Sequence, residues 1–223
     1  MVKLLFNKNR LILFFFSLII VLSGCVGKPN DPAEKMYTIL ENVVSKEKEF
    51  EKQQEPLAAL EKNEKDLYDK ILKLGMKEHG QIAQLADEAL ASAEKRKKYF
   101  ETETTSLKQS QTEFQKVANL KGKFEDKQLG KLADELYQIM MNRYSSHDEL
   151  YKQYTKAIEN DKELYQMFKN KDIALEDLEN QVKKVNESYQ KVYAENEKFN
   201  KFTESYNDKK LAFYKKAGLN PTK

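Results

Sequence analysis

The fold is decided by a stretch near the carboxyl end of the chain, IALEDLENQVKKVNESYQKVYAENEKFNKFTESYNDKKLAFYKKAG, residues 173–218. Apolar side chains recur there at every seventh position: Leu178, Val185, Val192, Phe199, Tyr206 and Phe213. This spacing is typical of long helices that pack against one another as in a coiled coil. Gly218 follows two lysines at the end of the stretch, where a glycine commonly ends a helix. The stretch therefore predicts one long amphipathic helix.

Three further stretches show the same helical period. The first follows Asn30-Asp31-Pro32, a typical helix start, and carries its apolar rows through residues 36–74. The second runs from about Gln81 to Leu120, and the third from about Asp126 to Lys169. No sustained alternation of apolar and polar residues competes with these helices, and glycine and proline are scarce. The whole region is therefore expected to be helical.

Short turns at residues 75–80, 119–123 and 170–172 predict that neighbouring helices run antiparallel. Segments of roughly 40 residues give helices about 60 Å long. We therefore expect an all-α fold in one domain, residues 32–223, built as an elongated antiparallel up-and-down bundle of three to four long helices with coiled-coil-like packing. Pro56 lies inside the first helix, and we expect it to kink or break that helix. A break would give five helical pieces.

The amino-terminal residues have the layout of a signal peptide. Residues 1–10 carry three basic side chains and no acid, and residues 11–22 are almost entirely apolar but too short to span a membrane comfortably. The sequence Leu22-Ser23-Gly24-Cys25 then resembles the lipobox of bacterial lipoproteins. The resemblance implies that residues 1–24 are removed by cleavage between Gly24 and Cys25. It also implies that a diacylglycerol is attached to the Cys25 thiol.

Cys25 is the chain's one cysteine, so an intrachain disulfide is impossible. Two acyl chains are about what stable membrane anchoring requires. Residues 25–31 then form a lipidated tether, of which residues 26–30 span about 17 Å when extended. We therefore expect a bundle held close to the outer face of the bacterial cytoplasmic membrane. The alternative is a free cysteine in an ordinary membrane segment.

The charge of the chain is balanced outside the signal peptide. The sequence has 39 basic and 36 acidic residues, and three of the basic ones lie in residues 1–24. The remainder therefore carries 36 of each sign, which removes the basic excess that nucleic-acid binding requires. Twelve tyrosines and twelve phenylalanines argue against disorder, since disordered chains are poor in aromatic residues.

The sequence shows no pattern of a catalytic or metal site. His79 and His147 lie far apart, and neither a zinc motif nor a glycine-rich phosphate loop is present. The carboxylates of residues 176–180 are expected to be solvated, and His147 to be half-buried in a structural role. We therefore expect no enzyme activity, no cofactor and no bound metal.

Tyrosines recur on the third helix, and they allow two interpretations. The candidate ligand contacts are Tyr137, Tyr144, Tyr151, Tyr154 and Tyr165. The favoured interpretation places these rings at the boundary of the bundle core, since tyrosine has an apolar ring and a polar tip. The alternative is an exposed stripe that stacks on sugar faces or holds an extended polymer.

Two charged residues of the second helix, Arg96 and Glu103, occupy core-like positions. We expect both side chains to turn outward to solvent. The alternative is a buried polar pair that fixes the register of the helices.

The chain as a whole resembles the YkyA-like family of proposed cell-wall-binding lipoproteins of low-GC Gram-positive bacteria. Besides the lipobox, the stretches MYTILENVVSKEKEFEKQQ, residues 36–54, and NRYSSHDELYKQY, residues 142–154, carry the resemblance. It implies an envelope location, a helical bundle and association with the wall. It supplies no catalytic residues.

The expected function is therefore that of a membrane-anchored lipoprotein whose extracytoplasmic bundle binds cell-wall polymer or an envelope partner without catalysis. The alternative is a helical adaptor or chaperone-like regulator of exported or envelope proteins. An envelope enzyme ranks last.

Overall fold

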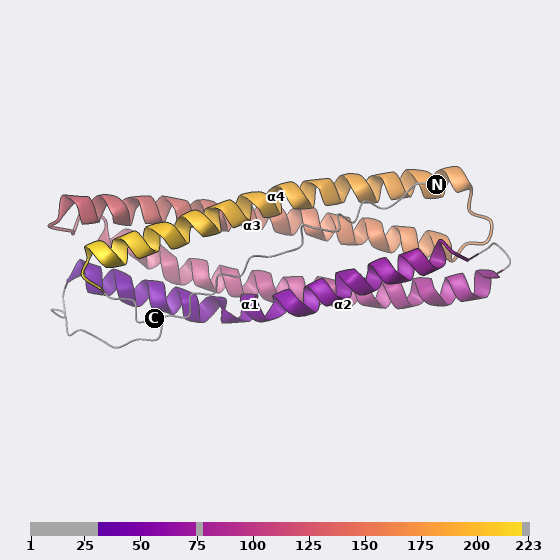
Figure 1. The fold of residues 1–223 in the computed structure, drawn as a ribbon, viewed down its shortest axis with the longest axis horizontal. Helices are drawn as coiled ribbons and strands as arrows, with labels where there is room; N and C mark the ends of the chain where they lie inside the picture. Colours follow the sequence, from indigo (N-terminus) through magenta and orange to yellow (C-terminus); the bar gives the residue numbers. More distant parts are fainter. Residues whose placement is uncertain (1–30, 75–77, 220–223) are drawn as a thin grey trace.

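The computed structural model describes residues 31–74 and 78–219, and these form four long α-helices and one short 3₁₀ helix without any strand (Figure 1). The helices are α1 (Pro32–Ile71), α2 (His79–Phe114), η2 (Gln115–Leu120), α3 (Lys127–Phe168) and α4 (Leu175–Lys216). The predicted all-α bundle is therefore confirmed.

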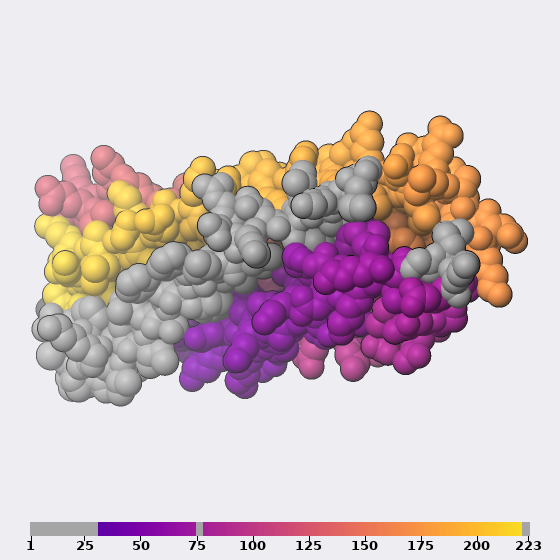
Figure 2. Space-filling view, turned by 45° about the vertical axis from the view of Figure 1, so that its right-hand side comes forward, coloured from indigo at the N-terminus to yellow at the C-terminus, as the bar shows by residue number. Residues whose placement is uncertain are grey.

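The four helices run up and down along one long axis (Figure 1). The α1–α2 pair and the α3–α4 pair are antiparallel hairpins, and the two hairpins meet mainly along α2 and α3. Each 42-residue helix is about 60 Å long. We call the end where α1 begins and α4 ends the proximal end, and the end where α1 ends and α4 begins the distal end. The space-filling view shows this elongated body, with α1 in purple and α4 in orange to yellow both reaching the same face (Figure 2).

The helix ends carry the caps that the sequence predicts. Asp31 accepts a hydrogen bond from the backbone N–H of Ala33 at 2.9 Å, so the first turn of α1 is capped. At the other end of the chain Gly218 has a φ of +68°, which a residue with a side chain would adopt only under strain. The N–H of Leu219 then donates to the carbonyl of Tyr214 at 2.9 Å, the bonding of a Schellman motif.

Two predicted boundaries differ from the structure. Helix α1 continues through Pro56, so of the two alternatives left open, a kink or a break, the break is excluded and the bundle has four long helices rather than five pieces. The packing of a 40-residue helix along its whole length supplies enough stability to retain one proline. Helix α2 begins at His79, which places Gly80 inside the helix rather than in the turn, and its last six predicted residues tighten into η2.

A side chain of α2 bonds to the backbone of α1 in the middle of that helix. The Ser106 hydroxyl donates to the carbonyl of Lys46 at 2.6 Å and accepts from the N–H of Phe50 at 3.0 Å. In a regular α-helix that carbonyl and that N–H pair with each other. The Ser106 hydroxyl therefore joins α2 directly to the backbone of α1. Side chains that bond to the backbone in this way are a known cause of helix bending.

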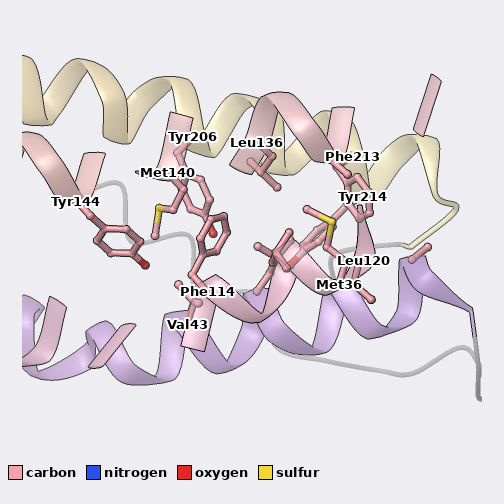
Figure 3. Close-up of a cluster of buried hydrophobic side chains, with 14 of the residues drawn as sticks. Met36, Val43, Phe114, Leu120, Leu136, Met140, Tyr144, Tyr206, Phe213 and Tyr214 are labelled. Carbon is pink, nitrogen blue, oxygen red and sulfur yellow. The ribbon is translucent and has the colours of Figure 1, made fainter. Parts of the chain in front are cut away.

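The apolar core forms two clusters along the long axis. The proximal cluster contains Met36, Leu40, Phe114, Leu136, Met140 and Phe213 among others (Figure 3). The distal cluster contains Leu67, Ala86, Ala89, Ala93, Ile158 and Val185 among others. The heptad row of α4 is buried from Val185 to Phe213, as predicted, whereas Leu178 is half-buried. Polar side chains lie between and within the clusters, and they form the site described next.

Candidate functional site

The tyrosines of α3 point into the bundle rather than forming a surface stripe. Tyr144, Tyr154 and Tyr165 are buried, and Tyr137 and Tyr151 are half-buried. A ring that stacks on a sugar needs an exposed face, so the exposed-stripe interpretation loses its basis. The position at the core boundary holds for the two half-buried rings, while the other three belong to the core itself.

Arg96 lies at the centre of a buried polar cluster that joins all four helices. Its side chain, 0% exposed, pairs with Asp161 of α3 at 2.5 Å and with Glu64 of α1 at 3.3 Å. Its second amino group donates to the Tyr189 hydroxyl of α4 at 2.7 Å, and that hydroxyl donates to Asp161 at 2.6 Å. The prediction that Arg96 turns outward is therefore wrong. Carboxylates from two other helices compensate for the cost of burying its charge.

A second carboxylate of α1 joins this cluster through a tyrosine. Tyr154 donates to Oε1 of Glu61 at 2.6 Å. The Arg96 guanidinium lies 5.4 Å from the centroid of the Tyr154 ring and 5.9 Å from that of Tyr189, within the range of cation–π attraction. Oε2 of Glu61 is buried and has no hydrogen-bond partner among the described residues.

The cluster holds more negative than positive groups. Three carboxyl groups, those of Glu61, Glu64 and Asp161, surround the one guanidinium of Arg96. Burial raises the pKa of Glu64 to about 8, although Arg96 opposes the shift. Burial also raises the pKa of Glu61 and of Asp161, again against the attraction of Arg96. The cluster therefore retains protons at pH values where exposed carboxyl groups have lost theirs.

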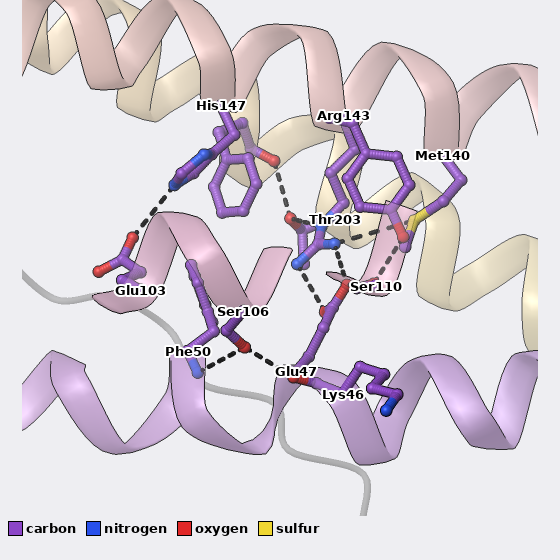
Figure 4. A network of polar contacts seen from close by, with 12 residues as sticks. Lys46, Glu47, Phe50, Glu103, Ser106, Ser110, Met140, Arg143, His147 and Thr203 are labelled. Carbon is purple, nitrogen blue, oxygen red and sulfur yellow. Dashed lines mark hydrogen bonds and ion pairs between the residues drawn. The ribbon is translucent and has the colours of Figure 1, made fainter. Parts of the chain in front are cut away.

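A second network surrounds Arg143, nearer the proximal end (Figure 4). Its guanidinium forms a two-pronged pair with Glu47 of α1, at 2.8 and 3.0 Å. Its Nε donates to Thr203 of α4 at 2.9 Å, and Ser110 of α2 donates to Glu47 at 2.6 Å. This network also joins all four helices, so it fixes their register along the long axis.

Glu103 and His147 face each other at 3.2 Å beside the Arg143 network (Figure 4). Gln54 donates to the other oxygen of Glu103 at 2.8 Å. The prediction that Glu103 turns outward is wrong, because these polar partners receive it inside the bundle. Burial lowers the pKa of His147 to about 3, and the charge of Arg143 adds to the effect. His147 is therefore neutral and structural, and it is fully buried rather than half-buried.

A cavity of about 60 Å³ lies between the Arg96 cluster and the Arg143 network. All four helices line this central cavity, with aromatic rings and two carboxyl groups prominent among its walls. The lining includes Glu61, Phe100, Glu103, Tyr154, Tyr189 and Phe199.

A wide surface groove of about 640 Å³ lies at the distal end, where α3 ends and α4 begins. In Figure 2 these orange segments occupy one end of the elongated body. The lining of this distal groove is mostly charged or amide-bearing and includes Glu163, Asp177, Asn180, Lys183, Lys184 and Glu187. The carboxylates of residues 176–180 are exposed, as predicted.

Metal sites, membrane-spanning helices and the predicted lipidation site remain to be compared with the structure. Within residues 31–74 and 78–219, no group of three or more histidine, cysteine or acidic residues could hold a metal ion. No helix of that same part of the chain is both long and apolar enough to cross a bilayer. The predicted lipidation site Cys25, the predicted cleavage site after Gly24 and nearly all of the predicted tether lie outside the described residues.

The sequence does contain a signal for the burial of Arg96 and Glu64. Glu64 interrupts the seven-residue apolar row of α1, and Arg96 interrupts a row of α2. Charges of opposite sign that interrupt facing rows of neighbouring helices indicate a buried pair. Asp161 and Glu61 carry no comparable signal, since neither stands in a row that the sequence marked as apolar.

The chain is similar to proteins of a known family. A family model described as "YkyA: Putative cell-wall binding lipoprotein" matches residues 31–216, nearly the whole described bundle. The chain belongs to the YkyA family. A YkyA protein of Bacillus subtilis (strain 168), named an uncharacterized lipoprotein, is 35% identical over 204 residues, which are 92% of this chain and 91% of that protein. The predicted membership of the YkyA-like family is therefore confirmed.

A solved structure shares the YkyA fold of this chain. A crystal structure of a conserved protein of unknown function from Staphylococcus aureus superposes with a TM-score of 0.61 at 19% identity. The match covers 84% of this chain and 97% of that protein. At this identity the likeness shows the fold alone.

Proposed function

We propose that this member of the YkyA family is held at the outer face of the cytoplasmic membrane by a diacylglycerol on Cys25, and that its distal end contacts cell-wall polymer. The observation that carries the proposal is the short distance along the chain between Cys25 and the start of α1 at Pro32. The family's description as cell-wall-binding lipoproteins supports it.

The geometry of the bundle supports a role as a spacer. Residues 26–30 reach about 17 Å at most, so the proximal end stays close to the membrane. The bundle then extends about 60 Å to the distal end, because its helices are 36 to 42 residues long. In the proposed upright arrangement, the distal groove lies at the end of the bundle that faces the wall.

The chemistry of the distal groove suits a hydrophilic polymer. Carboxylates, amides and ammonium groups line it, including Asp177, Asn180 and Lys183. Such groups exchange hydrogen bonds with sugar hydroxyls and peptide amides, and they remain hydrated when nothing is bound. A groove of this kind fits a weak and reversible contact.

A pull-down with purified peptidoglycan sacculi tests the wall contact. We expect wild-type protein to be retained, and the double substitution Lys183→Glu/Lys184→Glu to reduce retention several-fold by reversing charge in the distal groove. Both lysines are exposed, so the fold should be unaffected. The control is Lys191→Glu/Lys201→Glu, which makes the same charge change at exposed positions of α4 outside the groove. Failure of wild-type protein to bind bare sacculi would contradict the proposal.

The lipid anchor has a test of its own. We expect Cys25→Ala to abolish incorporation of a fatty-acid probe in living cells and to leave the chain uncleaved by the lipoprotein peptidase, because the acceptor thiol is gone. The measurement is metabolic labelling followed by fractionation of the membrane. Label on the Cys25→Ala chain would show that the anchor lies elsewhere.

The adaptor alternative has less support from the surface. Among the described residues, the exposed large apolar side chains are the scattered set Val44, Leu72, Tyr99 and Leu175. A groove for partner helices needs a continuous apolar face. Retention on sacculi only when membrane proteins are added would nevertheless favour the adaptor over direct wall binding.

A further inference from the structure

The central cavity has an entrance on the seam between α1 and α4. These two helices have few close backbone approaches, and long side chains bridge them, as where Tyr214 donates to Glu41 at 2.7 Å. At the mouth of the cavity Ala58 is exposed, and Tyr193 and Asn196 are half-buried. A small molecule can therefore reach the interior without unfolding the bundle.

Aromatic rings form most of the cavity's apolar walls. The ring centroids of Phe100 and Tyr154 lie 4.2 Å apart, and those of Phe50 and Phe199 lie 5.9 Å apart. Tyr189 adds a fifth ring from α4. Rings from four different helices thus surround one small space, and the faces of such rings attract cations.

A carboxylate oxygen in the same lining lacks a partner. Glu61 is only 8% exposed, and its Oε2 makes no hydrogen bond to any described residue. Arg96 does not supply that bond. Its two amino groups pair with Glu64, Asp161 and Tyr189, and its Nε, which is buried, makes no hydrogen bond to Glu61 or to any other described residue. A buried carboxylate oxygen without a partner is unfavourable, so the site favours a positively charged group beside Glu61.

The size and chemistry of the cavity narrow the class of ligand. The cavity volume of about 60 Å³ is several times the roughly 10–15 Å³ needed to admit one water molecule, so only a compact ligand fits. An anion would meet Glu61 and Glu103, and a neutral apolar molecule would leave Glu61 unpaired. A metal ion lacks a ligand set in this part of the chain. A compact organic cation satisfies the rings and the carboxylate together.

We propose that the central cavity binds the head group of a small organic ammonium ion, with Glu61 as its counter-ion and the surrounding rings against its carbon atoms. This inference goes beyond the proposed wall contact and does not depend on it. The two sites lie in different parts of the bundle, so failure at one leaves retention at the other measurable.

The test is a calorimetric titration of the full lipidated chain, kept in a non-ionic detergent, with choline chloride. The matched control ligand is 3,3-dimethylbutan-1-ol, which has the same shape but no charge. We expect saturable binding of choline and at least ten-fold weaker binding of the neutral alcohol. Equal affinity for both, or no binding of choline, would overturn the proposal.

Variants locate the binding. Glu61→Gln keeps the shape and an acceptor for Tyr154 but removes the charge, and we expect at least ten-fold weaker choline binding. Glu51→Gln, an exposed position of the same helix, is the control and should bind as wild type. Ala58→Trp blocks the mouth from an exposed position and should also abolish binding, which keeps the test decisive if Glu61→Gln does not fold. Wild-type affinity in both Glu61→Gln and Ala58→Trp would refute the assignment.

Discussion

Replacement of Arg96 by methionine is expected to destabilise the bundle by about 3–5 kcal/mol, since it leaves the buried acidic groups around it without their cation and hydrogen-bond donor. Arg96 is 0% exposed and pairs with Glu64 and Asp161 from two other helices. Methionine fills much of the same space, so the loss reflects charge more than volume. The cost is large against the 5–15 kcal/mol typical of a whole domain.

Urea unfolding followed by circular dichroism at neutral pH measures the effect. The matched control is Lys95→Met, the adjacent residue on α2, whose side chain is exposed and whose loss should change the free energy of unfolding by less than about 0.5 kcal/mol. A cost below about 1 kcal/mol for Arg96→Met would contradict the buried pairing.

A compensating variant separates lost pairing from lost packing. In the triple variant Arg96→Met/Glu64→Leu/Asp161→Leu, the unpaired carboxylates are removed as well. We expect it to recover a substantial part of the lost stability, because an apolar set of similar volume can replace a buried ionic one. If the triple variant loses as much stability as the three single substitutions together, the residues do not act as one cluster.

The arrangement of the helices could be predicted from local features of the sequence. The seven-residue row of α4 predicted its buried face, and Asp31 and Gly218 marked where the first helix begins and the last one ends. Each of these features depends on residues within a few turns of one another. Short turns then leave little choice but an antiparallel bundle.

The buried charges depend on residues far apart in the chain, and the sequence does not state their pairing. Arg96 stood in an apolar row, which indicated burial, while its charge indicated exposure. Arg96 is buried because Glu64 and Asp161 pair with it. They lie 32 and 65 residues away from Arg96 in the sequence, and their side chains reach it only in the folded bundle. Glu103 was misplaced for the same reason, since Gln54 and His147 reach it from other helices.

The central cavity could not be predicted at all from the sequence. Its volume is what remains after side chains of four helices have packed, and it depends on the spacing of α1 and α4. That spacing is set by the side chains that cross the seam, including Tyr214 and Glu41. The heptad pattern assigns residues to the interior but does not say whether they fill it.

The stability of the bundle is expected to fall as the pH rises from about 5 to about 8, and Glu64→Gln should reduce this dependence. The pKa of Glu64 is raised from its ordinary value of 4.5 to about 8, chiefly by burial. Between these values the folded protein holds a proton on Glu64 that the unfolded chain has released. Each pH unit in that window therefore costs at most about 1.4 kcal/mol of stability, and the contribution is complete above pH 8.

Glu64→Gln keeps the volume of the side chain and an oxygen that can accept from Arg96, but it cannot ionise. We expect it to match the wild type near pH 5 and to be more stable by about 2–4 kcal/mol at pH 9, as measured by urea unfolding at both pH values. Glu55→Gln, an exposed position of α1, is the control and should follow the wild-type curve.

Other titratable groups share the surroundings of Glu64, so part of the pH dependence should persist in the variant. They are Glu61 on α1, Arg96 on α2, Tyr154, Asp161 and Tyr165 on α3, and Tyr189 on α4. Burial raises the pKa of Glu61 and Asp161 in the same direction, so their slopes add to that of Glu64. Parallel stability curves for Glu64→Gln and wild type would contradict this prediction. They would mean that the folded and unfolded chains bind the same number of protons at Glu64, so that Glu64 is ionised in the folded bundle.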